Sequence, residues 1–185
     1  SARLSAGGNF SLLAYDTGRR IFAQSAPGSK GPKWRTEDST FNQTGTKLDI
    51  GGGLSIRAGG DIVAQGVQGN IGGGASLHAG GNVTLGTAVN GHVKTSEIKH
   101  KYDTWGGTAT TKITDVQRDI DITNSGNTWN VGGGMNIVAG GDIDITGAQI
   151  NSHGYNAQAG GNYAERAAYD VKEKLSVQTI KQDGF

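Results

Sequence analysis

The sequence predicts an all-β protein built from repeated, stacked units, and three observations support this prediction. The first is glycine content, because the 185 residues include 33 glycines and 2 prolines, far above the usual glycine share of about 7% and without the G-X-Y period of collagen. The second is a recurring string, A-G-G-N or A-G-G-D. The third is the alternation of apolar and polar residues around each copy, which is typical of strands with one buried face.

The recurring string predicts coils of equal length. It begins at Ala6, Ala58, Ala79, Ala139 and Ala159. Two of the intervals between these starts are about 20 residues long, and another is close to three times that length. A triple glycine precedes three of the copies by the same spacing, as in G-G-G-L-S-I-R-A-G-G-D at 51–61. Units this short cannot fold alone, so they must stack on one another. We therefore expect a parallel β-solenoid with about 20 residues per coil, each coil about 4.8 Å from the next.

Aligning the copies indicates which side chains face the core and which form the corners. The predicted core positions are Leu54, Ala75, Met135 and Tyr155; Leu4, Ile56, Leu77, Ile137 and Ala157; and, after the glycine pair, Phe10, Leu12, Ile62, Ala64, Val83, Leu85, Ile143 and Ile145. The glycines themselves are expected at tight corners, where side chains would clash.

Two stretches interrupt the repeat and predict projecting arms. Residues 15–47 contain both prolines and the run S-K-G-P-K-W-R-T-E-D. Residues 90–118 predict a β-hairpin with a turn near 103–107, after which the chain is expected to rejoin the coils at D-I-D-I-T (119–123), a string repeated at 142–146. Residues 169–185 resemble the outgoing strand of this hairpin and suggest a truncated third arm at 164–185, with a short helix over 164–175 as the alternative. Because Ser1 is not an initiator methionine, we interpret 1–185 as a single β-helical segment of a longer protein.

Composition argues against several classes of function. The net charge of +1 gives no reason to expect a nucleic-acid partner, and without cysteine there is neither a disulfide nor a thiolate metal site. No apolar run approaches the length of a membrane span. The histidines show no metal-ligand spacing and are expected on the surface: His78, His92, His100 and His153.

The carboxylates of the coils are the candidates for catalysis and for calcium binding. Asp61 is replaced by asparagine in other copies of the repeat, at Asn9, Asn82 and Asn162, so we interpret this position as a turn residue that bonds its own main chain. Glycoside chemistry needs a defined pair of carboxylates, and no pair recurs. Calcium-binding β-rolls repeat at nine residues, against about 20 in this chain. We expect no catalytic residue, no metal and no cofactor.

Positive charges and aromatic residues are concentrated in the two interruptions. They form a candidate surface for anionic glycans, lipopolysaccharide phosphates or a protein partner. The alternative is that these charges keep the arms soluble and block edge-to-edge pairing of strands. The candidate contact residues are Arg19, Arg20, Lys33, Trp34, Arg35, Lys99, Lys101, Tyr102 and Trp105.

Two repeat units and a hairpin carry a resemblance to a known family. The stretches G-G-G-L-S-I-R-A-G-G-D-I-V-A-Q-G (51–66) and G-G-G-M-N-I-V-A-G-G-D-I-D-I-T-G-A-Q-I (132–150), with the Lys/Thr-rich hairpin V-K-T-S-E-I-K-H-K-Y-D-T-W-G-G-T-A-T-T-K-I-T (93–114), resemble the haemagglutinin repeats of filamentous-haemagglutinin-type exoproteins. The insertion pattern is most similar to the distal repeats of CdiA-type effectors of contact-dependent growth inhibition. The resemblance covers residues 1–14 and 46–185, and the first interruption matches nothing in it.

The resemblance implies a right-handed parallel β-helix, export by the outer-membrane transporter of a two-partner system, and display as a filament on a Gram-negative cell. In such effectors the distal repeats engage the target cell's outer membrane, or a receptor there, and help to pass a toxin inward. We therefore expect a secreted, non-enzymatic, monomeric structural and interaction segment at the cell surface. The alternatives are a haemagglutinin-like adhesin for host glycans or receptors and a glycan-cleaving β-helix enzyme.

Overall fold

The structure is a computed structural model that describes residues 1–103, 106 and 109–184. Every regular element in this part of the chain is a β-strand, and it contains no helix long and apolar enough to cross a membrane. The chain divides into two units, which we call the coil stack (residues 1–16, 43–89 and 124–169) and the arm sheet (residues 17–42, 90–123 and 170–185).

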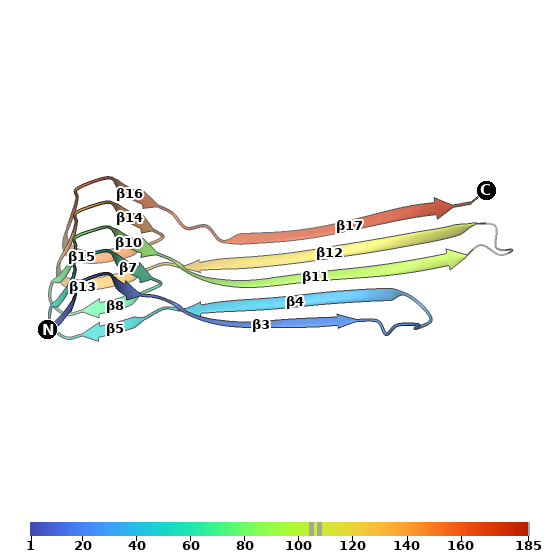
Figure 1. Cartoon of the computed structure of the whole chain (residues 1–185), viewed down its shortest axis with the longest axis horizontal. Coiled ribbons are helices and arrows are strands. Elements are labelled where there is room, and N and C mark those ends of the chain that lie inside the picture. Colours follow the sequence, from blue (N-terminus) through green and yellow to red (C-terminus); the bar gives the residue numbers. More distant parts are fainter. Residues whose placement is uncertain (104–105, 107–108, 185) are drawn as a thin grey trace. The chain divides into compact units, whose positions relative to one another are not determined.

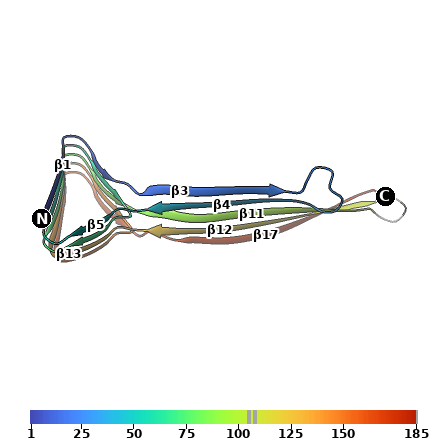
Figure 2. The same cartoon turned by 90° about the horizontal axis from the view of Figure 1, so that it is seen from below.

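The coil stack is built from parallel strands contributed by five successive copies of the repeat (Figure 1). One sheet contains β1, β6, β9, β13, β8 and β5 in that order, with β15 also paired to β13, and the other contains β16, β14, β10, β7 and β2. The coils superpose when seen from below (Figure 2). The strands are β1 (Ala2–Ala6), β2 (Phe10–Leu12), β5 (Lys47–Ile50), β6 (Leu54–Ala58), β7 (Ile62–Gln65), β8 (Gln68–Ile71), β9 (Ala75–Ala79), β10 (Val83–Gly86), β13 (Thr128–Ala139), β14 (Ile143–Thr146), β15 (Gln149–Ala159) and β16 (Tyr163–Arg166).

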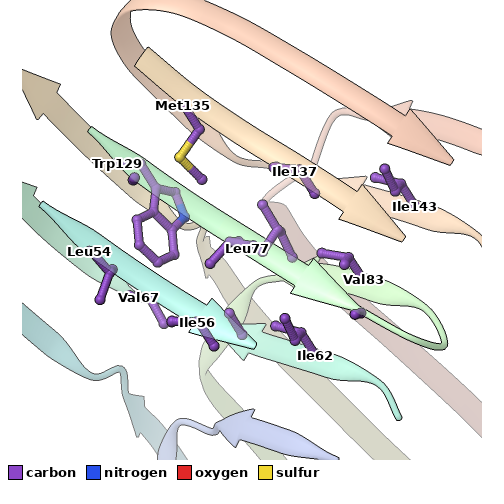
Figure 3. Packing of buried hydrophobic residues seen from close by; sticks show 14 of the residues in the cluster. Leu54, Ile56, Ile62, Val67, Leu77, Val83, Trp129, Met135, Ile137 and Ile143 are labelled. Atoms are coloured by element: carbon purple, nitrogen blue, oxygen red, sulfur yellow. The ribbon is translucent and has the colours of Figure 1, made fainter. Parts of the chain in front are cut away.

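Equivalent residues of the repeat lie side by side, as the alignment predicted. Leu54 pairs with Ala75, Ala75 with Met135, and Met135 with Tyr155. The inward side chains form a continuous core (Figure 3), and these predicted core residues are buried: Leu54, Ile56, Ile62, Ala64, Ala75, Leu77, Val83, Leu85, Met135, Ile137, Ile143 and Ile145. The core prediction is wrong for Leu4 (36% exposed) and Tyr155 (41% exposed). These two residues belong to the first and last of the five coils, which have a neighbouring coil on one side only.

Trp129 is the largest fully buried side chain of the core, although the repeat alignment did not point to it. It lies in β13 beside Gly69 of β8, where an added Cβ would approach the indole ring to 2.8 Å. The glycine therefore provides the space that the tryptophan fills.

The corner glycines are required by contact between coils more than by unusual backbone angles. An added Cβ at Gly80 would lie 2.3 Å from the carbonyl oxygen of Gly59 in the preceding coil. At Gly141 it would lie 2.2 Å from Oδ1 of Asn82. The same two contacts recur at the other A-G-G-N and A-G-G-D strings that follow a preceding coil, which explains why the string needs both glycines.

The residue after each glycine pair links one coil to the next. The backbone N–H of Asn82 donates to Oδ1 of Asp61 (2.7 Å), and the N–H of Asp142 donates to Oδ1 of Asn82 (2.7 Å). Asn9 and Asp142 accept in the same way from Asp61 and Asn162. The expectation that these side chains bond their own main chain is therefore wrong. Because the link needs one side-chain acceptor oxygen, asparagine and aspartate are interchangeable.

Asn127 joins three segments of the coil stack from a buried position, with 1% of its surface exposed. Its Oδ1 accepts from the N–H of Val67 (2.9 Å), and its Nδ2 donates to the carbonyl oxygens of Ala64 (3.2 Å) and Gly86 (2.7 Å). The buried amide thus has hydrogen-bond partners for both its oxygen and its nitrogen, and it links three backbone groups of the coil stack.

The arm sheet is an antiparallel layer in the order β17-β12-β11-β4-β3 (Figures 1 and 2). Its strands are β3 (Tyr15–Gln24), β4 (Lys33–Thr44), β11 (Ala88–Asp103), β12 (Thr110–Ser125) and β17 (Val171–Asp183). The two interruptions therefore pair with each other through β4 and β11, and residues 171–183 add a fifth strand. All residues of β3 and β17 are exposed.

Two local expectations fail in this region. The string D-I-D-I-T at 119–123 lies within β12 of the arm sheet, whereas its copy at 142–146 includes β14 of the coil stack. The chain therefore does not rejoin the coils at residue 119. The helical alternative for 164–175 is also wrong, because 163–166 and 171–183 are strands.

Candidate functional site

Cross-strand pairing in the arm sheet determines which side chains share a face. Directly opposed residues of an antiparallel pair point to the same side, and successive residues of a strand point to opposite sides. Lys33 of β4 is opposite Lys99 of β11, and Lys112 of β12 is opposite Lys181 of β17. Each pairing thus places two lysine side chains opposite each other on the same face of the sheet.

The two lysine pairs line a common groove. Lys101 follows Lys99 by two residues in β11 and lines it as well, and the groove has a volume of about 500 Å³. Thr114 and Thr179 stand opposite each other within it. We call this surface the lysine groove, and its five cations are Lys33, Lys99, Lys101, Lys112 and Lys181.

Three carboxylates lie within ion-pair distance of groove lysines. These carboxylates come from β11 and β17. Lys33 and Lys181 take no part in the three ion pairs. Lys33 instead donates from Nζ to the carbonyl oxygen of Ser29 (2.6 Å). Five lysines against three carboxylates leave two formal positive charges. The pairs are Lys99–Glu97 (2.8 Å), Lys101–Asp103 (3.1 Å) and Lys112–Asp183 (2.7 Å).

These contacts shift the protonation equilibria of three groups. The hydrogen bond to Asp183 raises the pKa of Lys112, and the same bond lowers the pKa of Asp183. A hydrogen bond from Thr110 and, next in size, one from Lys101 lower the pKa of Asp103. Lys112 therefore stays protonated, and both carboxylates stay ionised, throughout the neutral range.

The predicted contact residues do not form one surface. Lys33, Lys99 and Lys101 come together in the lysine groove. Trp34 and Tyr102 each directly follow a groove lysine, so their side chains belong to the opposite face of the sheet. Trp34 is opposite Ile98 there, and Tyr102 stacks on His100 with ring centroids 6.0 Å apart.

Two arginines of the first interruption, Arg20 and Arg35, have partners within their own part of the sheet. Arg20 pairs with Glu37 (2.5 Å), and the guanidinium of Arg35 lies 5.3 Å from the ring centroid of Phe22. Arg19 is exposed in β3. The last predicted contact, Trp105, lies outside the described residues.

Lys112 and Lys181 complete the groove but were not among the predicted contacts. They are far apart in the sequence and meet only because β12 pairs with β17. The only indication in the sequence was that the C-terminal segment resembles a hairpin strand. Such a likeness predicts a strand but not its partner or its register.

A second groove of about 640 Å³ runs along the coil stack. Its lining consists of equivalent residues from successive coils, and the polar ones include Asn70, Asn130 and Asn151. The Nδ2 of Asn130 donates to Oδ1 of Asn70 (3.0 Å), and the Nδ2 of Asn151 donates to Oδ1 of Asn130 (2.9 Å). Because these amides bond one another, we assign this ladder to stabilisation of the stack.

The side chains of the coils provide little evidence for a site of acid-base or metal chemistry. Asp61 and Asp142 are acceptors for backbone N–H groups of the neighbouring coil. Asp144 is held by Nη1 of Arg166 at 2.6 Å. Within the described residues, no group of three or more His, Asp or Glu side chains is arranged to hold a metal ion.

Comparison with known families gives a match to the hemagglutinin repeat over residues 25–179. This chain belongs to the hemagglutinin repeat family. The matched range is most of the chain and includes β4, so the expectation that the first interruption lies outside the family is wrong for residues 25–47. Hemagglutinin repeats are β-helical and are structural and adhesive elements, typically of secreted surface filaments. No match was found among the curated proteins or among the solved structures.

Proposed function

We propose that this hemagglutinin repeat segment is a non-enzymatic part of a secreted filament on a Gram-negative cell, in which a right-handed β-helix presents the arm sheet to a partner. The observation that carries the proposal is the contact between coils. Each corner presents an acceptor oxygen to the following coil and an N–H donor to the preceding coil. Its glycines allow the coils to approach closely. Such a unit suits an elongated scaffold, because each coil needs only its neighbours.

The finer part of the proposal is a role in contact-dependent growth inhibition. Here the segment would leave the cell through the outer-membrane transporter of a two-partner system, as a monomeric unit, and engage the outer membrane of a target cell during toxin delivery. Support comes from the likeness to the distal repeats of CdiA-type effectors and from the position of the lysine groove on a sheet with extensive solvent exposure.

A second candidate is an adhesin for anionic glycans of a host cell. The excess of lysine over carboxylate in the lysine groove supports it, because such a surface attracts sulfate and carboxylate groups as well as phosphate.

The two candidates differ in the surface that they bind. We would measure binding of the purified chain to Gram-negative outer-membrane vesicles and to immobilised host glycans, at physiological ionic strength. Binding to the vesicles supports the growth-inhibition role. Binding to glycans alone would replace it with the adhesin role, and binding to neither would remove both.

A further inference from the structure

We propose that the lysine groove is a binding site for phosphate groups, with Lys33, Lys99, Lys101, Lys112 and Lys181 as its cationic ligands. This inference deepens the proposed function, because it names the surface and the ligand chemistry through which the segment would meet an outer membrane.

Elsewhere along the β4–β11 and β12–β17 pairings, charged residues that face each other have opposite signs. These pairs are Lys94 with Asp38, Glu97 with Arg35, Asp119 with Lys174, and Asp121 with Lys172. Two of them also form ion pairs, at 3.6 Å for Lys174 and Asp119 and 3.2 Å for Lys172 and Asp121. Opposite charges in this arrangement stabilise a sheet.

The lysine groove breaks this rule twice. Lys33 faces Lys99, and Lys112 faces Lys181. Like charges placed directly opposite each other destabilise strand pairing. Both exceptions lie in one groove, on one face of the sheet. The two like-charged pairs lower the stability of the sheet at this place. We interpret this as evidence for a binding site in which an anion neutralises the lysines.

The charge balance and the donors of the groove favour phosphate. Two formal positive charges remain after the three carboxylates are counted, which matches a phosphate monoester carrying nearly two negative charges at neutral pH. The hydroxyl groups of Thr114 and Thr179 add donors between the lysines. Phosphate oxygens are strong acceptors for ammonium groups.

The phosphate could be carried by a membrane glycolipid or by a soluble compound. We would therefore measure binding of the full chain to phosphatidylcholine vesicles that contain a bisphosphorylated glycolipid, to the same vesicles with the dephosphorylated glycolipid, and to inorganic pyrophosphate in solution. Binding that requires the phosphates supports the groove. Pyrophosphate binding without vesicle binding would assign it to soluble phosphates, and equal binding to both kinds of vesicle would overturn the proposal.

The groove itself is tested with two double variants of equal charge change. Lys99→Gln with Lys181→Gln removes one member of each like-charged pair, and we expect phosphate-dependent binding to fall about tenfold or more, the usual size for loss of charge-assisted hydrogen bonds. The control, Lys172→Gln with Lys174→Gln, removes two lysines that already have carboxylate partners in the same sheet. It should bind phosphate-containing vesicles like the unsubstituted chain.

The outcomes separate this inference from the proposed function. Equal losses in both double variants would show diffuse charge attraction and overturn the groove. Undiminished binding by the groove variant would overturn it as well, while outer-membrane binding by the unsubstituted chain would still support the proposed function. A thermal unfolding curve for each variant verifies that the chain remains folded. A misfolded groove variant would be replaced by Lys33→Gln with Lys181→Gln, and the same criteria would then apply.

Discussion

In every A-G-G-N or A-G-G-D string after the first, the first glycine lies against the carbonyl oxygen of its counterpart in the preceding coil. At Gly80 the obstacle is the backbone of Gly59, which cannot swing aside as a flexible side chain could. Gly7 holds the same place in the first coil, and an added Cβ there meets nothing within 4 Å. Glycine is thus required at this position only where a preceding coil packs against it.

This difference predicts opposite results for one substitution at two equivalent positions. Gly80→Ala should lower the free energy of unfolding by about 1–3 kcal/mol, as is usual for overpacked sites. Gly7→Ala should leave it unchanged or slightly raise it, because alanine restricts the unfolded chain. Urea denaturation of both variants measures the two changes. Equal stability of Gly80→Ala and the unsubstituted chain would contradict the contact.

Asn127 permits a test that depends on pH. In Asn127→Asp, a buried carboxyl group would face the carbonyl oxygens of Ala64 and Gly86. Burial and these acceptors disfavour the charged form, so the folded-state pKa rises above the unfolded value of about 3.9. The variant should therefore be destabilised at neutral pH and regain stability as pH falls through the raised pKa toward the unfolded value. Urea denaturation at several pH values, with the unsubstituted chain as reference, would detect this recovery, and its absence would count against the hydrogen-bond scheme.

At the scale of elements, the arm sheet has little buried apolar surface, so cross-strand pairs matter more than they would over a core. Val116 opposite Val177 and Ile113 opposite Ile180 supply apolar contacts, yet Val177 and Ile180 remain exposed. The stability of this sheet should respond to the sign of each charged pair.

Two charge reversals in β17 therefore have opposite expected effects. Lys181→Glu places a carboxylate opposite Lys112 and should slightly raise the urea concentration at which the arm sheet unfolds. Lys174→Glu places a carboxylate opposite Asp119 and should slightly lower it. Tyrosine or tryptophan fluorescence can follow both transitions, with the unsubstituted chain as the reference. Shifts of the same sign in both variants would show that net charge matters and the register does not.

The two D-I-D-I-T strings show which elements local sequence can predict. Both have the alternation of a strand with one buried face, and both are strands. In the coil stack the string follows a glycine pair, and its register is set by the corner hydrogen bonds, so its neighbours could be predicted. In β12 it pairs with β17, which comes much later in the chain, and no corner sets that register. Alternation alone does not reveal which segment lies opposite.

At the scale of the whole molecule, the two units differ in how far their strand pairings could be predicted from the sequence. The regular recurrence of the A-G-G-N and A-G-G-D strings predicted the parallel stack and most of its core, because equivalent residues contact each other in every coil. The arm sheet combines three separate segments of the chain, and both like-charged pairs of the lysine groove come from long-range strand pairings. Three of its five lysines could be predicted as contacts, but the groove could not.

The two units should also differ in hydrogen exchange. The backbone amides of β9 and β13 lie between other coils over a buried core, whereas β3 and β17 are exposed along their whole length. We expect amides of β9 and β13 to exchange more slowly than those of β3 and β17 by roughly tenfold or more, since exposed regions with few apolar contacts open more readily. Exchange followed by mass spectrometry gives the comparison. Equal protection in β9 and β17 would contradict the expected difference in local stability.

The corner link has a further consequence for the way such a gene can change. Each coil offers an acceptor oxygen to the next and receives an N–H donor from it, and asparagine and aspartate serve equally well. A tandem duplication or a deletion of one repeat in the DNA therefore brings together two surfaces that already fit. Recombination between copies can lengthen or shorten the protein in whole coils, without compensating mutations at the new junction.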